Sequence, residues 1–383
     1  MESTMDLDNY EPVIRIVVIG CGGAGSNAVN RMIDDRIENV EFYVFNTDKQ
    51  ALATSKAPHR IVLGEEVTRG LGAGGDPSVG KAAAEQSKET IRSIVKGANM
   101  VFIAAGMGGG TGTGASPIVA QVAREEGALT IAIVTRPFAF EGKTRIANSV
   151  AGLSELKDAV DSIIIVSNDK LLMTSGNLPL SQAFSESDRV LAQSVKTVVE
   201  LILLPGTINR DFADVRTILK NSGIALIGFG EGHGEHKAQE AAENAINSPL
   251  LEASISGARK AICHITCGSE VSLYETQECV NRIIEQAGNS VDVKFGVAIN
   301  PQLSDCMLVS VIASDFTEEY DFTSIPTFQA PTSSSQVGSG VDRARQERIR
   351  ESEEMEEENP SEETSLSASI LPDFLRNGLG ERD

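Results

Sequence analysis

The stretch Gly106-Met-Gly-Gly-Gly-Thr-Gly-Thr-Gly114 indicates the fold of this 383-residue chain. It holds six glycines and two threonines in nine positions, follows a buried strand expected at residues 100–105, and precedes a helix expected at about 116–125. Glycines at such a turn let the backbone approach a phosphate, and the helix N-terminus supplies unpaired N–H donors. The loop lacks the lysine of G-x-x-x-x-G-K-[ST], so it is not a Walker P-loop.

A second glycine loop lies near the N-terminus. Residues 13–19 are all β-branched and apolar except Arg15, and this run predicts a buried strand. Gly20, Gly22 and Gly25 follow the run in the spacing G-x-G-x-x-G. Taken alone, this spacing is typical of a dinucleotide-binding Rossmann fold, with Asp48 close to where a ribose-binding acid belongs. Two phosphate-binding loops at one sheet edge favour a polyphosphate instead.

Strands and helices alternate through the first half of the chain. Further strands are expected at 41–45, 129–135 and 163–167, and further helices at about 27–32 and 79–95. This alternation predicts a parallel sheet with helices on both faces.

A long helix is expected next, because apolar residues recur at helical spacing from Ser187 until Pro205-Gly206 stops them. Its length would be roughly 27 Å. The region from about 223 to 316 mixes strands with helices and is interpreted as a separate α+β domain. Its strands are expected at 225–229, 261–266 and 307–313, and its helices near 237–246 and 273–286.

Composition excludes several classes of function. The net charge of −21, the absence of Trp and the aromatic content of 4% argue against a nucleic-acid partner. The five cysteines are an odd number without a C-x-x-C pair, which fits reduced thiols in a cytosolic protein. No apolar run approaches the roughly 18 residues of a membrane span, so direct membrane insertion is not expected.

A metal site is not predicted from the sequence. His233 and His236 could share a helix face, but no cysteine or third histidine stands beside them in the chain.

Beyond about residue 319 the composition changes to Pro, Ser, Thr and Gln, and then to a glutamate-rich run. Such a segment cannot bury enough apolar surface to offset chain entropy, so we expect disorder at 319–368. An apolar patch returns in 369–383 and is either a partner-docking peptide or a chance cluster. Its residues are Ile370, Leu371, Pro372, Phe374, Leu375 and Arg376.

Four motifs in order carry a specific resemblance: Asn46-Thr-Asp48, the GGGTGTG string, Pro137-Phe-Ala-Phe-Glu-Gly-Lys-Thr-Arg145, and Asn209-Arg-Asp-Phe-Ala-Asp-Val-Arg216. The chain resembles the FtsZ family, bacterial cell-division relatives of tubulin, from about residue 13 to 316 and again in the tail. The resemblance implies an α/β fold with a Rossmann-like parallel-sheet GTPase domain, a long central helix, a second α+β domain and a disordered C-terminal tail. The expected boundaries are a flexible arm at 1–12, the GTP-binding domain at 13–182, the central helix at 183–206, a catalytic loop with its following helix at 207–222, the second domain at 223–318, the linker at 319–368 and the docking peptide at 369–383.

The resemblance also implies a nucleotide site for GTP or GDP, with Mg²⁺ held by the phosphates and water and no metal-binding side chain. The two glycine loops would wrap the phosphates, 73–75 would close near the terminal one, Glu141 and Arg145 would contact the ribose, and Phe184, Asn27 and Asp188 would contact the guanine. The implied residues are Gly22, Gly23, Ala24, Gly25, Ser26, Asn27, Asn46, Asp48, Ala73, Gly74, Gly75, Gly108, Gly109, Gly110, Thr111, Gly112, Thr113, Glu141, Arg145, Phe184 and Asp188. Without the resemblance, the simplest interpretation of Glu141 and Arg145 is an exposed i, i+4 ion pair. The simplest interpretation of Phe184 is a side chain packed in the core.

Asn209, Asp211 and Asp214 would be catalytic in this family, although by sequence alone Asp211 could simply be a helix cap. If Asp188 touches the base, these acids stand roughly 27 Å away at the far end of the helix. They would then serve the next subunit of a head-to-tail filament, since a heterologous contact that does not close generates an open polymer.

The expected function is therefore a polymerising GTPase of the bacterial division ring, located in the cytoplasm at the division site. The tail would bind membrane-tethering division proteins. Two alternatives stay open from the residues: an NAD-dependent oxidoreductase built on the first glycine loop, and a filament that binds GTP without hydrolysing it.

Overall fold

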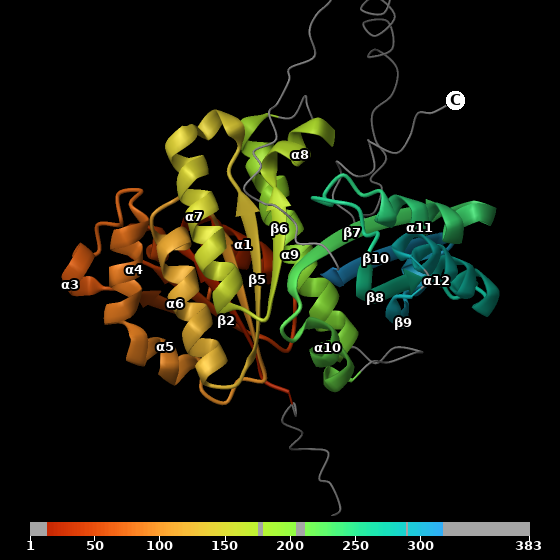
Figure 1. Cartoon of the computed structure of the whole chain (residues 1–383), viewed down its shortest axis with the longest axis horizontal. Coiled ribbons are helices and arrows are strands. Elements are labelled where there is room, and N and C mark those ends of the chain that lie inside the picture. The colour runs from red at the N-terminus through yellow and green to blue at the C-terminus, as the bar shows by residue number, and fades with distance from the viewer. Residues whose placement is uncertain (1–13, 175–178, 204–210, 289, 317–383) are drawn as a thin grey trace, which may run out of the picture. The chain divides into compact units, whose positions relative to one another are not determined.

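The computed structural model describes residues 14–174, 179–203, 211–288 and 290–316 of the chain (Figure 1). Four of the sequence-based expectations fall outside these residues. They are the flexible arm at 1–12, the catalytic role of Asn209, the linker at 319–368, and the docking peptide with Ile370, Leu371, Pro372, Phe374, Leu375 and Arg376.

Within the described residues, the strands form one sheet in the order β3-β2-β1-β4-β5-β6-β7-β10-β8-β9. Neighbouring strands from β3 to β7 are parallel, β10 is antiparallel to both β7 and β8, and β9 is parallel to β8. The strands are β1 (Ile16–Cys21), β2 (Glu41–Asn46), β3 (His59–Val62), β4 (Met100–Gly106), β5 (Leu129–Arg136), β6 (Ser162–Ser167), β7 (Gly223–His233), β8 (Ala258–Cys267), β9 (Asp292–Ile299) and β10 (Cys306–Phe316).

The helices lie between these strands in chain order. They are α1 (Gly22–Asp34), α2 (Lys49–Ala53), α3 (Glu65–Thr68), α4 (Pro77–Gln86), α5 (Lys88–Val95), α6 (Thr111–Glu125), α7 (Lys143–Ala159), α8 (Asn168–Thr174), α9 (Leu180–Leu203), α10 (Phe212–Leu219), α11 (Lys237–Ile246) and α12 (Leu273–Ala287). None of the helices in the described part of the chain has both the length and the apolar character of a membrane span.

The central strands form where the sequence offers apolar residues for both faces. β1, β5 and β6 are buried at every position, as expected for parallel strands covered on two sides. The strands predicted from the sequence are confirmed, with boundaries shifted by a few residues. β3 and β9 were not predicted, because the four residues of β3 and most of β9 are partly exposed and lack a clean apolar pattern.

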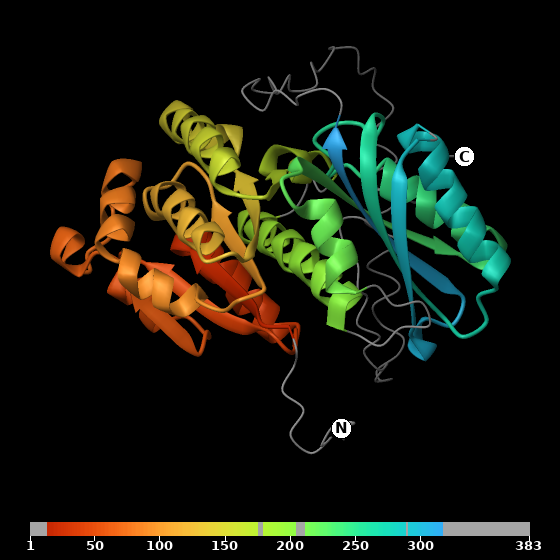
Figure 2. The same cartoon turned by 60° about the horizontal axis from the view of Figure 1, so that its bottom comes forward.

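The described part of the chain holds three hydrophobic cores. One face of the sheet packs against α1, α9 and α10, and the opposite face of the N-terminal strands packs against α4, α5, α6 and α7. A third core joins α11 and α12 to β7, β8 and β10. α9 contributes to a core that reaches from β2 to β10, and Figure 2 shows this helix between the red-to-yellow and the blue elements.

β7 belongs to both parts of the sheet. Its first three residues pair with β6, and its positions from Leu226 onward pair with β10. The predicted domain boundary at Gly223 therefore falls on the first residue of a strand that both parts share.

Candidate functional site

Two helix N-termini meet at the carboxyl edge of the sheet. β1 and β4 are adjacent and parallel, so the turns that follow them lie side by side. α1 begins at Gly22, directly after β1, and α6 begins at Thr111, after the short glycine turn that follows β4. Each N-terminus presents unpaired N–H groups and a partial positive charge, which together favour an anion.

Close packing explains why two of the glycines in the first loop cannot carry a side chain. Gly22 has a φ of +72°, and a Cβ added there would lie 2.8 Å from the backbone N of Gly112. A Cβ on Gly25 would lie 2.3 Å from the carbonyl O of Ala104. The two N-termini and β4 therefore approach one another more closely than any larger residue allows.

Two other glycines face open space. A Cβ added to Gly23 or Gly109 would meet nothing within 4 Å, and both residues line a cavity of about 420 Å³. Their backbone is thus accessible to whatever enters the cavity. A volume of this size falls within the roughly 300–1,000 Å³ typical of small-molecule sites.

The cavity brings together residues from both glycine turns, from the ends of β4 and β5, and from α8 and α9. Its lining residues are Gly23, Ala24, Asn27, Gly106, Met107, Gly109, Gly110, Thr111, Gly112, Thr135, Pro137, Glu141, Arg145, Asn168, Phe184, Ser187 and Asp188.

An aromatic cluster holds Phe184 at one side of the cavity. The ring of Phe138 is fully buried and meets the ring of Phe184 edge-on, with centroids 5.2 Å apart. Phe184 itself is 41% exposed, so one part of its ring stays available to a ligand. Phe140 stacks on Phe138, with ring centroids 5.0 Å apart.

Asp188 lies one helical turn after Phe184 and also lines the cavity. Burial raises the pKa of its carboxyl to about 7, and the positive charge of Arg31 opposes this rise. A carboxylate whose charge is costly because of burial is suited to accept hydrogen bonds from a ligand that carries N–H donors. Asn168, which accepts a hydrogen bond from the Ser187 hydroxyl at 2.9 Å, lines the same region.

Glu141 and Arg145 form the i, i+4 ion pair that the sequence offered as the simple explanation. The backbone N of Phe138 donates to Oε1 of Glu141 at 2.9 Å, and this side chain is only 11% exposed. The Arg145 side chain is 57% exposed. Both residues nevertheless line the cavity, so the pair is part of its wall.

Ten of the predicted site residues do not line the cavity: Gly22, Gly25, Ser26, Asn46, Asp48, Ala73, Gly74, Gly75, Gly108 and Thr113. Several of them shape the loops from behind. Thr113 Oγ1 accepts a hydrogen bond from the N of Gly108 at 2.8 Å, and the Ser26 hydroxyl donates to the O of Gly22 at 2.7 Å.

Asp48 accepts hydrogen bonds from the backbone N of Gln50 and Ala51, so it caps α2. The buried Asn46 accepts from the N of Asp48 at 3.2 Å. The 73–75 turn adjoins the second glycine loop, where a Cβ on Gly110 would lie 2.8 Å from the Cβ of Ala73.

Sequence reasoning missed six lining residues: Gly106, Met107, Thr135, Pro137, Asn168 and Ser187. Most of them stand at or just after the carboxyl ends of β4, β5 and β6. Ligands of open parallel sheets bind beyond these ends, so the strand termini were the signal that could have found them.

The acidic pair lies away from the cavity. Asp211 is the N-cap of α10, and its carboxylate accepts from the backbone N of Asp214 at 2.8 Å, as the simple cap interpretation predicts. Between Asp188 and Leu203, α9 spans about 22 Å at 1.5 Å per residue. Figure 1 shows α8, whose first residue Asn168 lines the cavity, at the opposite end of the sheet from α10.

Comparisons with known proteins agree with this geometry. Residues 15–176 match the Tubulin/FtsZ family, GTPase domain, and residues 223–317 match the FtsZ family, C-terminal domain. The structure is similar to that of an FtsZ dimer from M. jannaschii, at 42% sequence identity, with a TM-score of 0.75 over 79% of this chain and 88% of that one.

Two CetZ proteins of Haloferax volcanii share the fold at lower identity. CetZ2, solved as a GTPγS-bound protofilament, is 20% identical with a TM-score of 0.69 over 90% of this chain and all of that one. CetZ1, solved as a GDP-bound monomer, is 21% identical with a TM-score of 0.69 over 80% of this chain and 95% of that one.

A nucleotide-sized cavity between two helix N-termini, with family matches on both sides of α9, answers the question that the first glycine loop left open. The family matches make the chain a GTP-hydrolysing protein rather than a dinucleotide-dependent oxidoreductase. The chain belongs to the tubulin/FtsZ family of GTPases.

Proposed function

We propose that GTP binds in the 420 Å³ cavity with its phosphates at the N-termini of α1 and α6. The open backbone of Gly23 and Gly109 would receive the phosphate oxygens. Phe184 would lie against the guanine ring, and the Asp188 carboxylate would accept hydrogen bonds from its N–H donors. Arg145, held by Glu141, would border the ribose.

Mg²⁺ fits this site as an ion carried by the nucleotide. The carboxylates that line the cavity are Glu141 and Asp188, and the first is engaged by Arg145. Mg²⁺ keeps several waters and commonly binds substrate phosphates, so it would need few protein ligands here. When bound, it would neutralise charge that develops on the transferred phosphoryl group.

We further propose that hydrolysis occurs between subunits. The single observation that carries this proposal is the separation of about 22 Å that α9 imposes between Asp188 and its own C-terminal end, beyond which Asp211 and Asp214 follow. These two acids cannot reach the cavity of their own chain. In a head-to-tail contact they would enter the cavity of the next subunit and orient the attacking water.

The biological role that fits this chemistry is a filament of the cell-division ring, as the sequence resemblance implies. The relative from M. jannaschii was solved as a dimer, and CetZ2 was solved as a protofilament. In this proposal Asn209 contributes to catalysis, and the tail peptide at 370–376 binds membrane-tethering proteins.

The proposal is tested by light scattering and phosphate release on the purified full chain with Mg²⁺ and GTP, GDP or NAD. We expect scattering to rise with GTP and to decay as phosphate appears, and activity per subunit to increase steeply with protein concentration. A turnover rate per subunit that does not change with dilution would contradict the shared site. Saturable NAD binding without assembly would contradict the GTP proposal itself.

Asp214→Ala separates binding from hydrolysis. The variant should retain GTP binding, measured by equilibrium dialysis, and lose most of its turnover, because positioning of a nucleophile contributes several kcal/mol. Unchanged turnover would remove Asp214 from the mechanism.

A further inference from the structure

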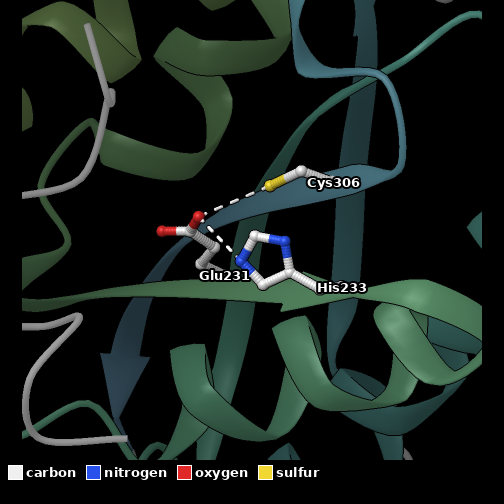
Figure 3. A group of neighbouring side chains, drawn as sticks. All are labelled: Glu231, His233 and Cys306. Atoms are coloured by element: carbon white, nitrogen blue, oxygen red, sulfur yellow. Dashed lines mark hydrogen bonds and ion pairs between the residues drawn. The ribbon is translucent and has the colours of Figure 1, made fainter. Parts of the chain in front are cut away.

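Three side chains of different chemical types converge at the end of β7, outside the nucleotide cavity. β7 and β10 are antiparallel, and their register places Cys306 directly opposite His233. Glu231 stands two positions before His233 and therefore points to the same face of the sheet. Figure 3 shows the three side chains turned toward one another.

The donor atoms of this cluster are close together. Nε2 of His233 lies 3.0 Å from Oε1 of Glu231, and Sγ of Cys306 lies 3.5 Å from the same oxygen. All three donor atoms lie within 4.8 Å of one another. Around a tetrahedral Zn²⁺ with bonds of about 2.0–2.3 Å, ligand atoms stand about 3.3–3.8 Å apart. Small side-chain rotations would bring the three atoms to these separations.

We propose that Glu231, His233 and Cys306 form a binding site for Zn²⁺, with the fourth position taken by water. A thiolate, an imidazole and a carboxylate are the ligands that Zn²⁺ accepts, whereas Mg²⁺ and Ca²⁺ prefer oxygen ligands alone. The side chain of His233 is 64% exposed, which leaves the site open to solvent and to the entering ion.

Charge balance favours a divalent cation at this cluster. On binding, the Cys306 thiol would release its proton to solvent, so Sγ would coordinate as a thiolate beside the Glu231 carboxylate and the neutral imidazole. The two negative charges would then be neutralised by the ion. The net charge of −21 on the whole chain also raises the local concentration of cations.

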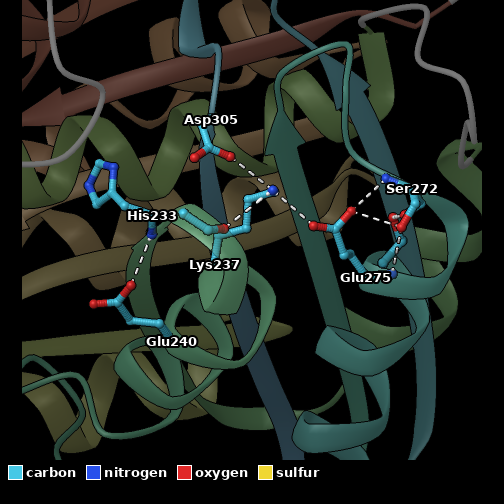
Figure 4. A network of polar contacts seen from close by, with 8 residues as sticks. His233, Lys237, Glu240, Ser272, Glu275 and Asp305 are labelled. Carbon is cyan, nitrogen blue, oxygen red and sulfur yellow. Dashed lines mark hydrogen bonds and ion pairs between the residues drawn. The ribbon is translucent and has the colours of Figure 1, made fainter.

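The backbone that presents the ligands is fixed by a separate polar network, shown in Figure 4. The N of His233 donates to Oε2 of Glu240 at 2.9 Å, and the N of Gly234 donates to the O of Asp305 at 3.3 Å. The first bond ties His233, the last residue of β7, to α11, and the second ties Gly234 to Asp305, the residue that precedes Cys306. Such support orients metal ligands before the ion arrives.

Lys237 extends this network to α12. Its ammonium lies 2.9 Å from Oδ1 of Asp305 and 2.9 Å from Oε1 of Glu275. The hydrogen bond from Lys237, with further bonds from Ser272, lowers the pKa of Glu275 to about 2. Lys237 forms ion pairs with Asp305 and Glu275, so these two acids are not counted as ligands. The proposed ligands of the ion are the three residues of the cluster.

The neighbours of these three residues along the chain give no sign of this site. His233 has no cysteine beside it in sequence, and Cys306 reaches it only through the pairing of β7 with β10. The competing explanation is an ordinary ion pair between Glu231 and His233 next to a buried thiol, with no ion bound.

Zinc titration of the metal-stripped full chain decides between them. Competition with a chromophoric zinc chelator should give one Zn²⁺ per chain, in the presence of GDP and without Mg²⁺. His233→Ala and Cys306→Ser should each weaken Zn²⁺ binding at least about tenfold. Loss of a residue that only supports a metal ligand already lowers metal affinity by about that factor. His236→Ala, at an exposed histidine three residues from His233, is the matched control and should leave binding unchanged.

Co²⁺ provides a readout that reports the ligand atoms directly. Co²⁺ added to the wild-type chain should give a thiolate-to-metal charge-transfer band, and Cys306→Ser should abolish it. His233→Ala changes an exposed side chain, so it keeps the test valid if Cys306→Ser does not fold. The proposal is wrong if the wild type shows no such band, or if His233→Ala binds Zn²⁺ as tightly as the wild type.

Discussion

The glycines of the first loop do two different things, and Gly23 and Gly25, on either side of Ala24, illustrate them. Gly25 is required for packing, because a Cβ there would meet the backbone of Ala104 and Gly20 at 2.3 and 2.9 Å. Gly23 has free space around the position of a Cβ and lines the cavity. Within one sequence motif, Gly25 therefore serves packing and Gly23 is available for binding.

Alanine substitution should separate these roles. Gly25→Ala should lower the free energy of unfolding by about 2–3 kcal/mol, because backbone atoms cannot move aside for the methyl group. Gly23→Ala should change stability by less than about 1 kcal/mol, since alanine is the better helix former. It should nevertheless weaken GTP binding. Urea denaturation and nucleotide titration of the two variants check both statements, and equal loss of stability in both would contradict them.

Asp188 makes the stability of the nucleotide-free protein depend on pH. Because burial raises its pKa to about 7, the folded chain holds a proton that the unfolded chain releases above about pH 4. The free energy of unfolding contributed by this group is therefore largest below pH 4, falls as pH rises toward 7, and levels off above it.

Asp188→Asn should remove this pH dependence. At pH 8 the nucleotide-free variant should be more stable than the wild type by up to about 2 kcal/mol, after a discount for partial exposure. Near pH 4 the difference should vanish. GTP binding should weaken, because the amide offers one acceptor oxygen without charge. Thermal unfolding across this pH range tests the idea, and a variant less stable than the wild type at pH 8 would overturn it.

At the scale of helices, Asp211 has two possible roles, as the N-cap of α10 and as a catalytic acid. Asp211 caps the helix through the backbone N of Asp214, so any loss of turnover in a variant could come from a frayed helix rather than from lost catalysis.

Two substitutions at Asp211 distinguish these causes. Asp211→Ala should lower the free energy of unfolding by about 1 kcal/mol through loss of the cap. Asp211→Asn keeps a good cap and should cost almost no stability, yet it should lose most of the GTP turnover, because the charge that polarises water is gone. Turnover in Asp211→Asn equal to that of the wild type would leave Asp211 as a cap alone.

Helix and strand signals differed in how well the sequence predicted them. The apolar runs of β1, β4, β5 and β6 predicted their strands, since burial on both faces leaves a continuous pattern. α1 and α6 begin several residues before the predicted helices, at positions rich in glycine. Glycine disfavours a helix locally, and only the contact between the two N-termini, which no local pattern records, overrides that preference.

The candidate site was predictable to the same degree. The glycine turns and the resemblance named residues such as Phe184 and Asp188 that the fold brings to one cavity. Thr135 and Asn168 stand at the ends of predicted strands, but they were missed because only the order of β5 and β6 in the sheet brings those strand ends to the cavity.

For the whole molecule, the proposed shared site can be tested by mixing two inactive proteins. One is Asp214→Ala, and the other carries both cavity substitutions, Gly23→Ala and Asp188→Asn. If subunits pair at random in an equal mixture, about a quarter of the contacts join an intact cavity to intact acids. The mixture should regain up to about that fraction of wild-type phosphate release, whereas two self-contained sites would regain none.

The uneven pairing of β7 has a consequence for how the native protein opens. Three positions of this strand pair with β6, and eight pair with β10. Amide protons on β7 should therefore exchange with deuterium in step with those of β10 and β8, as one cooperative unit. Hydrogen-exchange protection factors should change abruptly between β6 and β7. The boundary at Gly223 would then separate two parts of the sheet that open with different free energies.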